Sequence, residues 1–308
     1  MAQPLSIEHE KWVYLITTRT SGSRLWFIKC PDLEERILGC LARYQARHEV
    51  VIYGFILMGN HYHLLARFPK QNRALFMRDF NSAVARLVGR YVKEHGRRSV
   101  WARRYSYQVL IRAEDVFHWF MYLSLNPVSS GIVPRIQEYR SYNSYFDASR
   151  GMKRSYKWID WSKYLMQVRF KPSLTEEDFI NEYELSYSRL PGYEDLSKEE
   201  YQKALSREVE KRQASIRSER FSRGEGFLGL KLMKTQVPGQ VPRSSKSSSR
   251  YSFRPLVLTL CIETKKTFLS LYFAIRESFT IASRAFRAGD FKVSFPSGTY
   301  PPPRLAVV

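Results

Sequence analysis

Two histidines separated by one residue, His61 and His63, stand within an apolar stretch of this sequence. In an extended strand, alternate side chains share a face, so the two imidazoles would project side by side while Tyr62 points to the other face. Imidazole is the commonest metal ligand in proteins, so this pair could form part of a metal site. A hydrogen-bonded pair of histidines on a half-buried strand would give the same pattern. A third ligand and a reactive group must come from elsewhere in the chain.

A second pair of polar side chains lies further along the chain, in an apolar segment that predicts a tightly packed helix from Glu114 to Leu125. Tyr122 and Asn126 are four residues apart, which places them on one helical face. Pro127 ends the helix and biases Asn126 away from helical backbone angles, but the preceding turn still fixes its Cα. The two side chains can therefore face the same point.

The elements that must position these residues alternate between strands and helices. Apolar and β-branched runs predict four strands, at 11–18, 49–57, 61–68 and 107–111. Apolar residues at helical spacing predict helices at 31–47, 72–95 and 114–125. This order predicts an α+β fold with a ferredoxin-like (RRM-like) antiparallel sheet and helices on one face, followed by a mostly helical C-terminal extension.

The charge of the chain indicates its partner. Lys and Arg number 50 against 29 Asp and Glu, a net charge of +21, which favours nucleic acid as the bound polyanion. One segment combines basic residues with aromatic ones: Arg86, Arg90, Lys93, Arg97, Arg98, Trp101, Arg103, Arg104 and Tyr105. Arginines contact phosphates and aromatic rings stack on bases, which suits single-stranded nucleic acid. A solvated helix face followed by a core strand fits the segment equally well.

Three widely spaced cysteines form no ligand pair and indicate no disulfide framework. The N-terminus lacks the apolar core of a signal peptide, and the apolar run 255–262 is too short to span a bilayer. We therefore expect a reduced, cytoplasmic and nucleoid-associated protein with no membrane partner.

The spacing of three motifs resembles the HUH single-tyrosine transposases, and most closely the REP-associated tyrosine transposases and related insertion-sequence enzymes. The motifs are MGNHYH at 58–63, WARRY at 101–105 and YLSLNPV at 122–128. The resemblance extends over residues 11–148. Gly59 stands where the family commonly has proline, and Tyr62 where a smaller aliphatic residue is usual; neither change removes a reacting group.

The resemblance implies a metal-dependent single-stranded DNA endonuclease and strand transferase. In such an enzyme, His61, His63 and the side-chain oxygen of Asn126 would hold one Mg²⁺ or Mn²⁺. Tyr122 would attack phosphorus to form a 5′-phosphotyrosine intermediate at hairpin-bearing DNA. The protein would act as a monomer or a homodimer.

Two other functions fit parts of the sequence. A ferredoxin-like domain with exposed aromatic residues can bind RNA without catalysis, but it has no need of the two histidines and the Tyr122–Asn126 pair. A relaxase or replication initiator would share the chemistry, but relaxases usually have a third histidine in the metal motif.

Beyond a catalytic domain at 1–150, the composition predicts three further regions. They are a helical accessory region at 151–235, a flexible basic linker at 236–254, and a C-terminal amphipathic helix with a tail at 255–308. Between Thr175 and Glu200, acidic residues far outnumber basic ones, so we expect that stretch to dock on the basic domain or on a partner.

Overall fold

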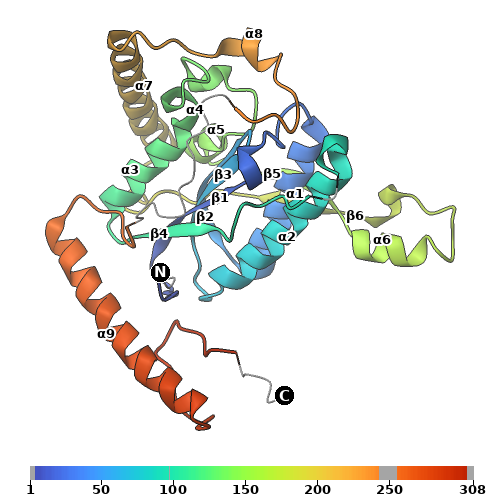
Figure 1. Cartoon of the computed structure of the whole chain (residues 1–308). Coiled ribbons are helices and arrows are strands. Elements are labelled where there is room, and N and C mark those ends of the chain that lie inside the picture. Colours follow the sequence, from blue (N-terminus) through green and yellow to red (C-terminus); the bar gives the residue numbers. More distant parts are fainter. Residues whose placement is uncertain (1–3, 97, 243–254, 304–308) are drawn as a thin grey trace.

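The core of the protein is a four-stranded antiparallel sheet with the strand order β2-β3-β1-β4 (Figure 1). A computed structural model describes residues 4–96, 98–242 and 255–303. The strands are β1 (Val13–Arg19), β2 (Val51–Met58), β3 (His61–Arg67) and β4 (Ser106–Leu110). The helices between them are α1 (Pro31–His48) and α2 (Arg73–Tyr91). This βαββαβ order with β1 and β3 in the centre is the predicted ferredoxin-like fold, which is thereby confirmed.

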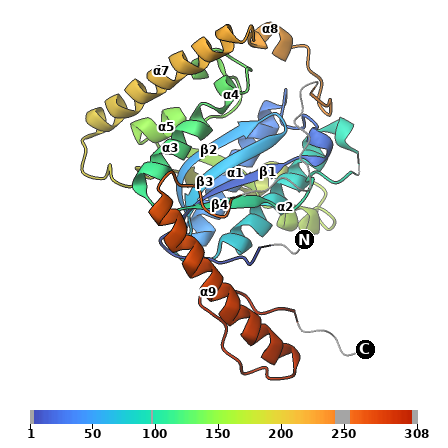
Figure 2. The ribbon, with the colours of Figure 1, turned by 60° about the vertical axis from the view of Figure 1, so that its left-hand side comes forward.

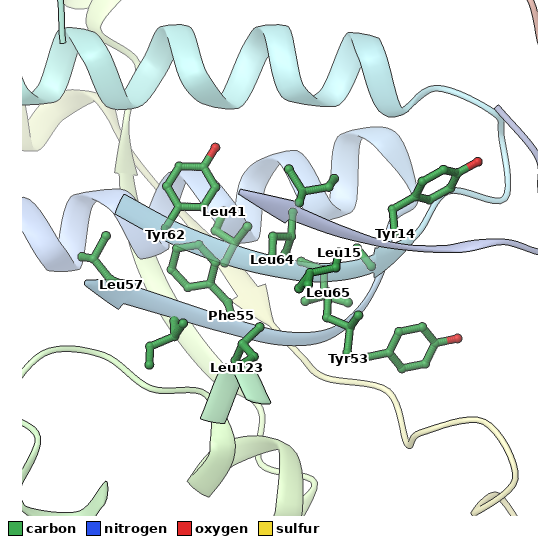
Figure 3. Close-up of a cluster of buried hydrophobic side chains, with 14 of the residues drawn as sticks. Tyr14, Leu15, Leu41, Tyr53, Phe55, Leu57, Tyr62, Leu64, Leu65 and Leu123 are labelled. Atoms are coloured by element: carbon green, nitrogen blue, oxygen red, sulfur yellow. The ribbon is translucent and has the colours of Figure 1, made fainter. Parts of the chain in front are cut away.

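Helices lie on both faces of this sheet, and not on one face only as predicted. On one face, the Tyr62 ring lies 5.4 Å from Phe80 of α2. On the other, α3 (Ala113–Ser124) packs so closely on β2 that Phe120 fills the space beside Gly54. Figure 3 shows Tyr62 and Leu123 of α3 on opposite sides of the two neighbouring strands. The nearly all-apolar composition of α3 fits a helix that is covered on most sides.

The first part of the C-terminal extension was expected to be helical, and this prediction was wrong. Residues Arg154–Ile159 (β5) and Ile180–Leu185 (β6) form an antiparallel pair that packs on α1. Tyr156 and Trp158 alternate with exposed neighbours, which is the period of a strand. Ser186, just after β6, exchanges two hydrogen bonds with Gln45 of α1, at 2.8 and 3.1 Å.

The remainder of the extension is mostly helical, as predicted. Its helices are α6 (Trp161–Gln167), α7 (Lys198–Ser222), α8 (Gly229–Met233) and α9 (Ile262–Arg287). Figure 2 shows α7 running over the side of α3 and α9 projecting from the body. Part of the predicted linker is packed, because Leu25 N donates to Gln240 O at 2.9 Å. Residues 243–254 of that linker lie outside the described residues, and the domain boundaries stay predictions.

Both outer edges of the sheet pair with other parts of the chain. On the β2 side, Leu57 N donates to Tyr142 O at 3.0 Å and Ser144 N donates to Phe55 O at 2.9 Å. On the β4 side, Val109 N donates to Leu256 O at 2.9 Å, and Leu258 N donates to Val109 O at 2.8 Å. Within the described ranges, no helix has the length and apolar character needed to cross a membrane.

The contact between the β5–β6 pair and α1 depends on Gly39. A methyl group at this position would overlap the backbone carbonyl oxygen of Lys157. We expect Gly39→Ala to lower the free energy of unfolding by about 1–3 kcal/mol, because overpacking forces the two backbones apart. Equilibrium urea unfolding measures this change.

Gly89→Ala provides the matched control. Gly89 lies in α2, is exposed, and has nothing within 4 Å of an added methyl group. Alanine there should raise the free energy of unfolding by about 0.5–1 kcal/mol, through helix propensity alone. Equal effects of the two substitutions would contradict the packing argument.

Candidate active site

His61 and His63 lie side by side on one face of β3, as the alternation of a strand requires. Their ring centroids are 5.0 Å apart and the rings are nearly perpendicular. Both are largely buried, with 9% and 6% of their surfaces exposed. Tyr62 between them is fully buried on the opposite face, where its hydroxyl donates to Asn81 Oδ1.

The neighbouring strand β1 supplies two more polar side chains to the same face. Thr17 is directly opposite His63 and Arg19 is directly opposite His61, and opposed residues of an antiparallel pair share a face. Thr17 Oγ1 lies 2.8 Å from His63 Nδ1. Sequence reasoning missed both residues. The signal that could have found them is the β1–β3 register, which sets the last residues of β1 against the histidines.

A hydrogen bond fixes which nitrogen of His61 carries a proton. Asn60 Oδ1 lies 2.6 Å from His61 Nδ1, while Asn60 Nδ2 donates to Ser23 O at 3.0 Å. Because the Asn60 amide nitrogen is engaged, its oxygen accepts from Nδ1–H, and the Nε2 lone pair of His61 is left for a ligand. Asn60 thus fixes the orientation and the tautomer of the His61 imidazole.

Helix α3 brings Tyr122 to the histidines. The Tyr122 ring centroid lies 5.9 Å from that of His63 and 4.9 Å from that of Trp119. The phenol is 39% exposed, so it combines contact with the histidine pair and access from solvent.

Asn126 follows a break between two helices. Helix α3 ends at Ser124. A short helix, α4 (Asn126–Ser129), starts two residues later with Pro127 in its first turn. The Asn126 side chain is buried, and its Nδ2 lies 3.4 Å from His63 Nε2. Ser130 Oγ donates to Asn126 Oδ1 at 3.3 Å. The structure therefore brings together all four predicted site residues from β3, α3 and α4.

Burial dominates the electrostatics of this site, and it lowers the pKa of the Arg19 guanidinium as well as that of His61. Burial, His63 and Arg19 together hold the pKa of His61 well below its ordinary value. Burial raises the pKa of Tyr122, while the Arg19 guanidinium and a hydrogen bond to Asn126 act in the opposite direction. Arg19 is thus the cation placed to stabilise negative charge on the phenol oxygen.

The donor set fits a divalent metal with oxygen and nitrogen ligands. Across the described residues, no group of three or more His, Cys, Asp and Glu side chains lies together, so a carboxylate or thiolate site is not built here. Two imidazoles and one amide oxygen remain, provided that the Asn126 amide presents its oxygen rather than its nitrogen to His63. Such a set leaves coordination positions open for a substrate oxygen.

The predicted DNA contacts divide into two groups. Six are exposed cations: Arg86, Arg90, Lys93, Arg98, Arg103 and Arg104. Trp101 is half-buried, packs 6.0 Å from Tyr62 and donates its indole N–H to Asn81 O. Tyr105 packs beside Tyr107 at 6.2 Å. These contacts favour structural roles for the two rings, while Arg97 lies outside the described residues.

Comparison with known proteins finds a family match within the N-terminal part of the chain. The family model described as "Transposase IS200 like" matches residues 15–115. No curated protein matches the chain. The matched range includes Arg19, His61 and His63, and it ends before Tyr122, so the role of that tyrosine depends on the geometry described above.

Two solved structures are similar to parts of the chain. A REP-associated tyrosine transposase bound to a REP hairpin is 14% identical over 47% of this chain and 84% of that one, with a TM-score of 0.41. A candidate transposase from Deinococcus radiodurans R1 is 15% identical over 35% of this chain and 84% of that one, with a TM-score of 0.26. Through residues 15–115, about a third of its length, the chain is similar to the IS200-like transposases.

Proposed function

We propose that this protein is a metal-dependent endonuclease and strand transferase for hairpin-bearing single-stranded DNA, and that Tyr122 is its nucleophile. The observation that carries the proposal is the meeting of Tyr122 and Asn126 with His63, at 5.9 Å between rings and 3.4 Å between nitrogens. The three side chains come from the separate elements α3, α4 and β3. They meet beside the Tyr122 ring, which is partly exposed and therefore not simply part of the packed core. A non-catalytic nucleic-acid binding domain would not need this arrangement.

His61, His63 and Asn126 would hold Mg²⁺ or Mn²⁺. A divalent ion held by these residues would supply neutralisation of the charge that develops on a phosphoryl oxygen. The protein groups around it keep the ligands in place: Asn60 orients His61, and Thr17 contacts the Nδ1 of His63. Because burial and Arg19 keep the pKa of His61 low, its imidazole is neutral and able to coordinate at physiological pH.

The reaction exchanges one phosphoester for another. The Tyr122 oxygen attacks the scissile phosphorus, an O–P bond forms, and the bond from phosphorus to the 3′ oxygen of the preceding nucleotide breaks. The phenol proton passes to solvent, and the leaving 3′ oxygen takes up a proton from solvent. The products are a 5′-phosphotyrosine and a free 3′-hydroxyl. Because the phosphoester bond is conserved, a second 3′-hydroxyl can reverse the step and join a new strand. Arg19 stabilises the phenolate as the proton leaves Tyr122.

The direct test is to incubate the full chain with a single-stranded hairpin oligonucleotide and Mn²⁺, then to separate the products under denaturing conditions. We expect a DNA–protein adduct that survives denaturation, and none when EDTA replaces Mn²⁺. Mass spectrometry of the digested adduct should find the nucleotide on Tyr122. Specific DNA binding with no adduct under these conditions would favour the non-catalytic binding function.

Replacing Arg19 by glutamine tests the residue that the sequence did not indicate. We expect the single-turnover rate of adduct formation to fall by about 10²-fold, because a charged donor next to the reacting oxygen is lost. Arg135→Gln removes an exposed arginine that pairs with Glu138 and should leave the rate unchanged. An unchanged rate in Arg19→Gln would restrict Arg19 to a structural role.

A further inference from the structure

A cluster of arginines lies on the outer side of the α1–α2 layer, where the β5–β6 pair packs on α1. Arg36 and Arg43 come from α1, and Arg86 and Arg90 come from α2. Three of them surround one buried side chain: Arg43, Arg86 and Arg36 each lower the pKa of the Cys40 thiol, which burial raises to about 12. The positive charges of two helices are therefore concentrated at one surface.

These four arginines lack the acidic partners that neighbouring cations have. In the described parts of the chain, none of the four has a carboxylate oxygen within 4.0 Å. On the same helix layer, Arg47 and Arg78 both pair with Asp79, at 3.9 and 2.9 Å. Mutual repulsion without compensation costs free energy, and an anion bound at this surface would remove that cost.

Two tryptophans, Trp158 of β5 and Trp161 of α6, hold guanidinium groups of this cluster in place. The Arg43 guanidinium lies 3.5 Å above the Trp158 ring, and that of Arg90 lies 3.2 Å above the Trp161 ring. Stacking fixes the plane of a guanidinium and leaves its N–H groups directed outward, where they can bind phosphate oxygens. Arg36 has a buried Nη1 with no hydrogen-bond partner in the described structure.

The cluster lies on the α1–α2 side of the sheet and the active site on the α3 side, and the chain from α2 to β4 carries exposed cations from one toward the other. Arg90 is in the last turn of α2, and the chain continues from there through the exposed residues Lys93 and Arg98 to Arg103. Arg103 is close enough to Arg19 to lower the pKa of its guanidinium. Arg19 in turn lies beside Tyr122. A strand whose scissile phosphate is at Tyr122 could thus follow cations to the outer surface of the helix layer.

Resting on the function proposed above, we propose that Arg36, Arg43, Arg86 and Arg90, oriented by Trp158 and Trp161, bind the phosphodiester backbone of single-stranded DNA that flanks the cleavage site. Helix α6 extends this surface outward (Figure 1). Beyond α6, Phe170 is 86% exposed between two basic residues, Arg169 and Lys171, and its ring can stack on a base of the same strand.

The test is the salt dependence of binding, measured by fluorescence anisotropy with the full chain and a labelled single-stranded oligonucleotide in EDTA, so that no cleavage occurs. For Arg36→Gln combined with Arg43→Gln, we expect the Kd to rise by about tenfold. The slope of log K against log salt should become shallower by about 1.4, since each phosphate contact contributes about 0.7 for single strands.

The matched control is Arg47→Gln combined with Arg78→Gln, which removes the same charge from the same helix layer. Both residues are exposed and already paired with Asp79, so the slope should be unchanged. Equal changes in both double variants, or no change in the first, would overturn the proposal.

Arg43→Gln removes the stacking on Trp158, and this loss can lower the stability of the fold. A second pair of variants therefore leaves Arg43 in place. Arg36→Gln and Arg86→Gln do not stack on an indole, and each should reduce the slope by about 0.7. The outcome is independent of catalysis, because binding in EDTA requires no adduct. A shallower slope without adduct formation by the natural chain would therefore reject the proposed enzyme and retain this surface.

Discussion

Replacing Tyr122 by phenylalanine is expected to abolish the covalent DNA adduct and to leave DNA affinity nearly unchanged. The substitution removes only the phenol oxygen, which is the atom that attacks phosphorus, and keeps the ring that contacts His63 and Trp119. The oxygen is not needed for folding, because the side chain is 39% exposed. Denaturing electrophoresis of labelled DNA after incubation with Mn²⁺ measures the adduct, and anisotropy measures the affinity.

Tyr105→Phe is the control for this experiment. Tyr105 is the other candidate nucleophile in the basic segment, but its ring packs beside Tyr107 and burial raises the pKa of its hydroxyl. We expect this variant to form adducts at the normal rate. Adducts in Tyr122→Phe and none in Tyr105→Phe would show that the nucleophile has been wrongly assigned.

Replacing both His61 and His63 by alanine is expected to remove metal binding and cleavage together. Only the Asn126 oxygen of the proposed ligand set would remain, and a single neutral oxygen does not hold a divalent ion in water. Isothermal titration with Mn²⁺ should show loss of the binding isotherm. The rate of adduct formation should fall by at least about 10²-fold, because charge developing on the phosphoryl oxygens is no longer neutralised.

His118→Ala provides a control with the same chemical change. His118 is exposed on α3, packs against Trp119 at 5.6 Å and is not part of the proposed ligand set. Its loss should leave the titration and the rate unchanged. A titration that is the same for the natural chain and the double variant would reject the ligand assignment. Thermal unfolding of both variants shows whether the fold is retained.

The sequence predicts this site well where the periodicity of a strand or a helix alone determines in which direction a side chain points. The alternation of β3 places His61 and His63 on one face, and the four-residue spacing places Tyr122 near Asn126. The break at Leu125 was also foreseeable from Pro127, and the Asn126 side chain still reaches His63. These are local rules, and they require no knowledge of which elements pack together.

What the sequence could not provide depends on pairing between distant segments. Arg19 enters the site only because the β1–β3 register sets it against His61, and no local pattern fixes a register. Trp101 resembles a stacking residue in the sequence, but Tyr62 and Asn81 already contact it. The β5–β6 pair was predicted as helix because its aromatic residues satisfy both periods over so short a run, and packing on α1 decides between them.

The pairing of both sheet edges restricts how two copies of this protein can associate. An exposed edge strand offers unpaired N–H and C=O groups to a second chain. Here the segment at 142–144 occupies the β2 edge and the segment at 256–258 occupies the β4 edge. Two copies therefore cannot join their sheets into one without displacing a segment of their own chain. Self-association that keeps this fold must therefore use other surfaces, such as the helices, the loops or the β5–β6 pair.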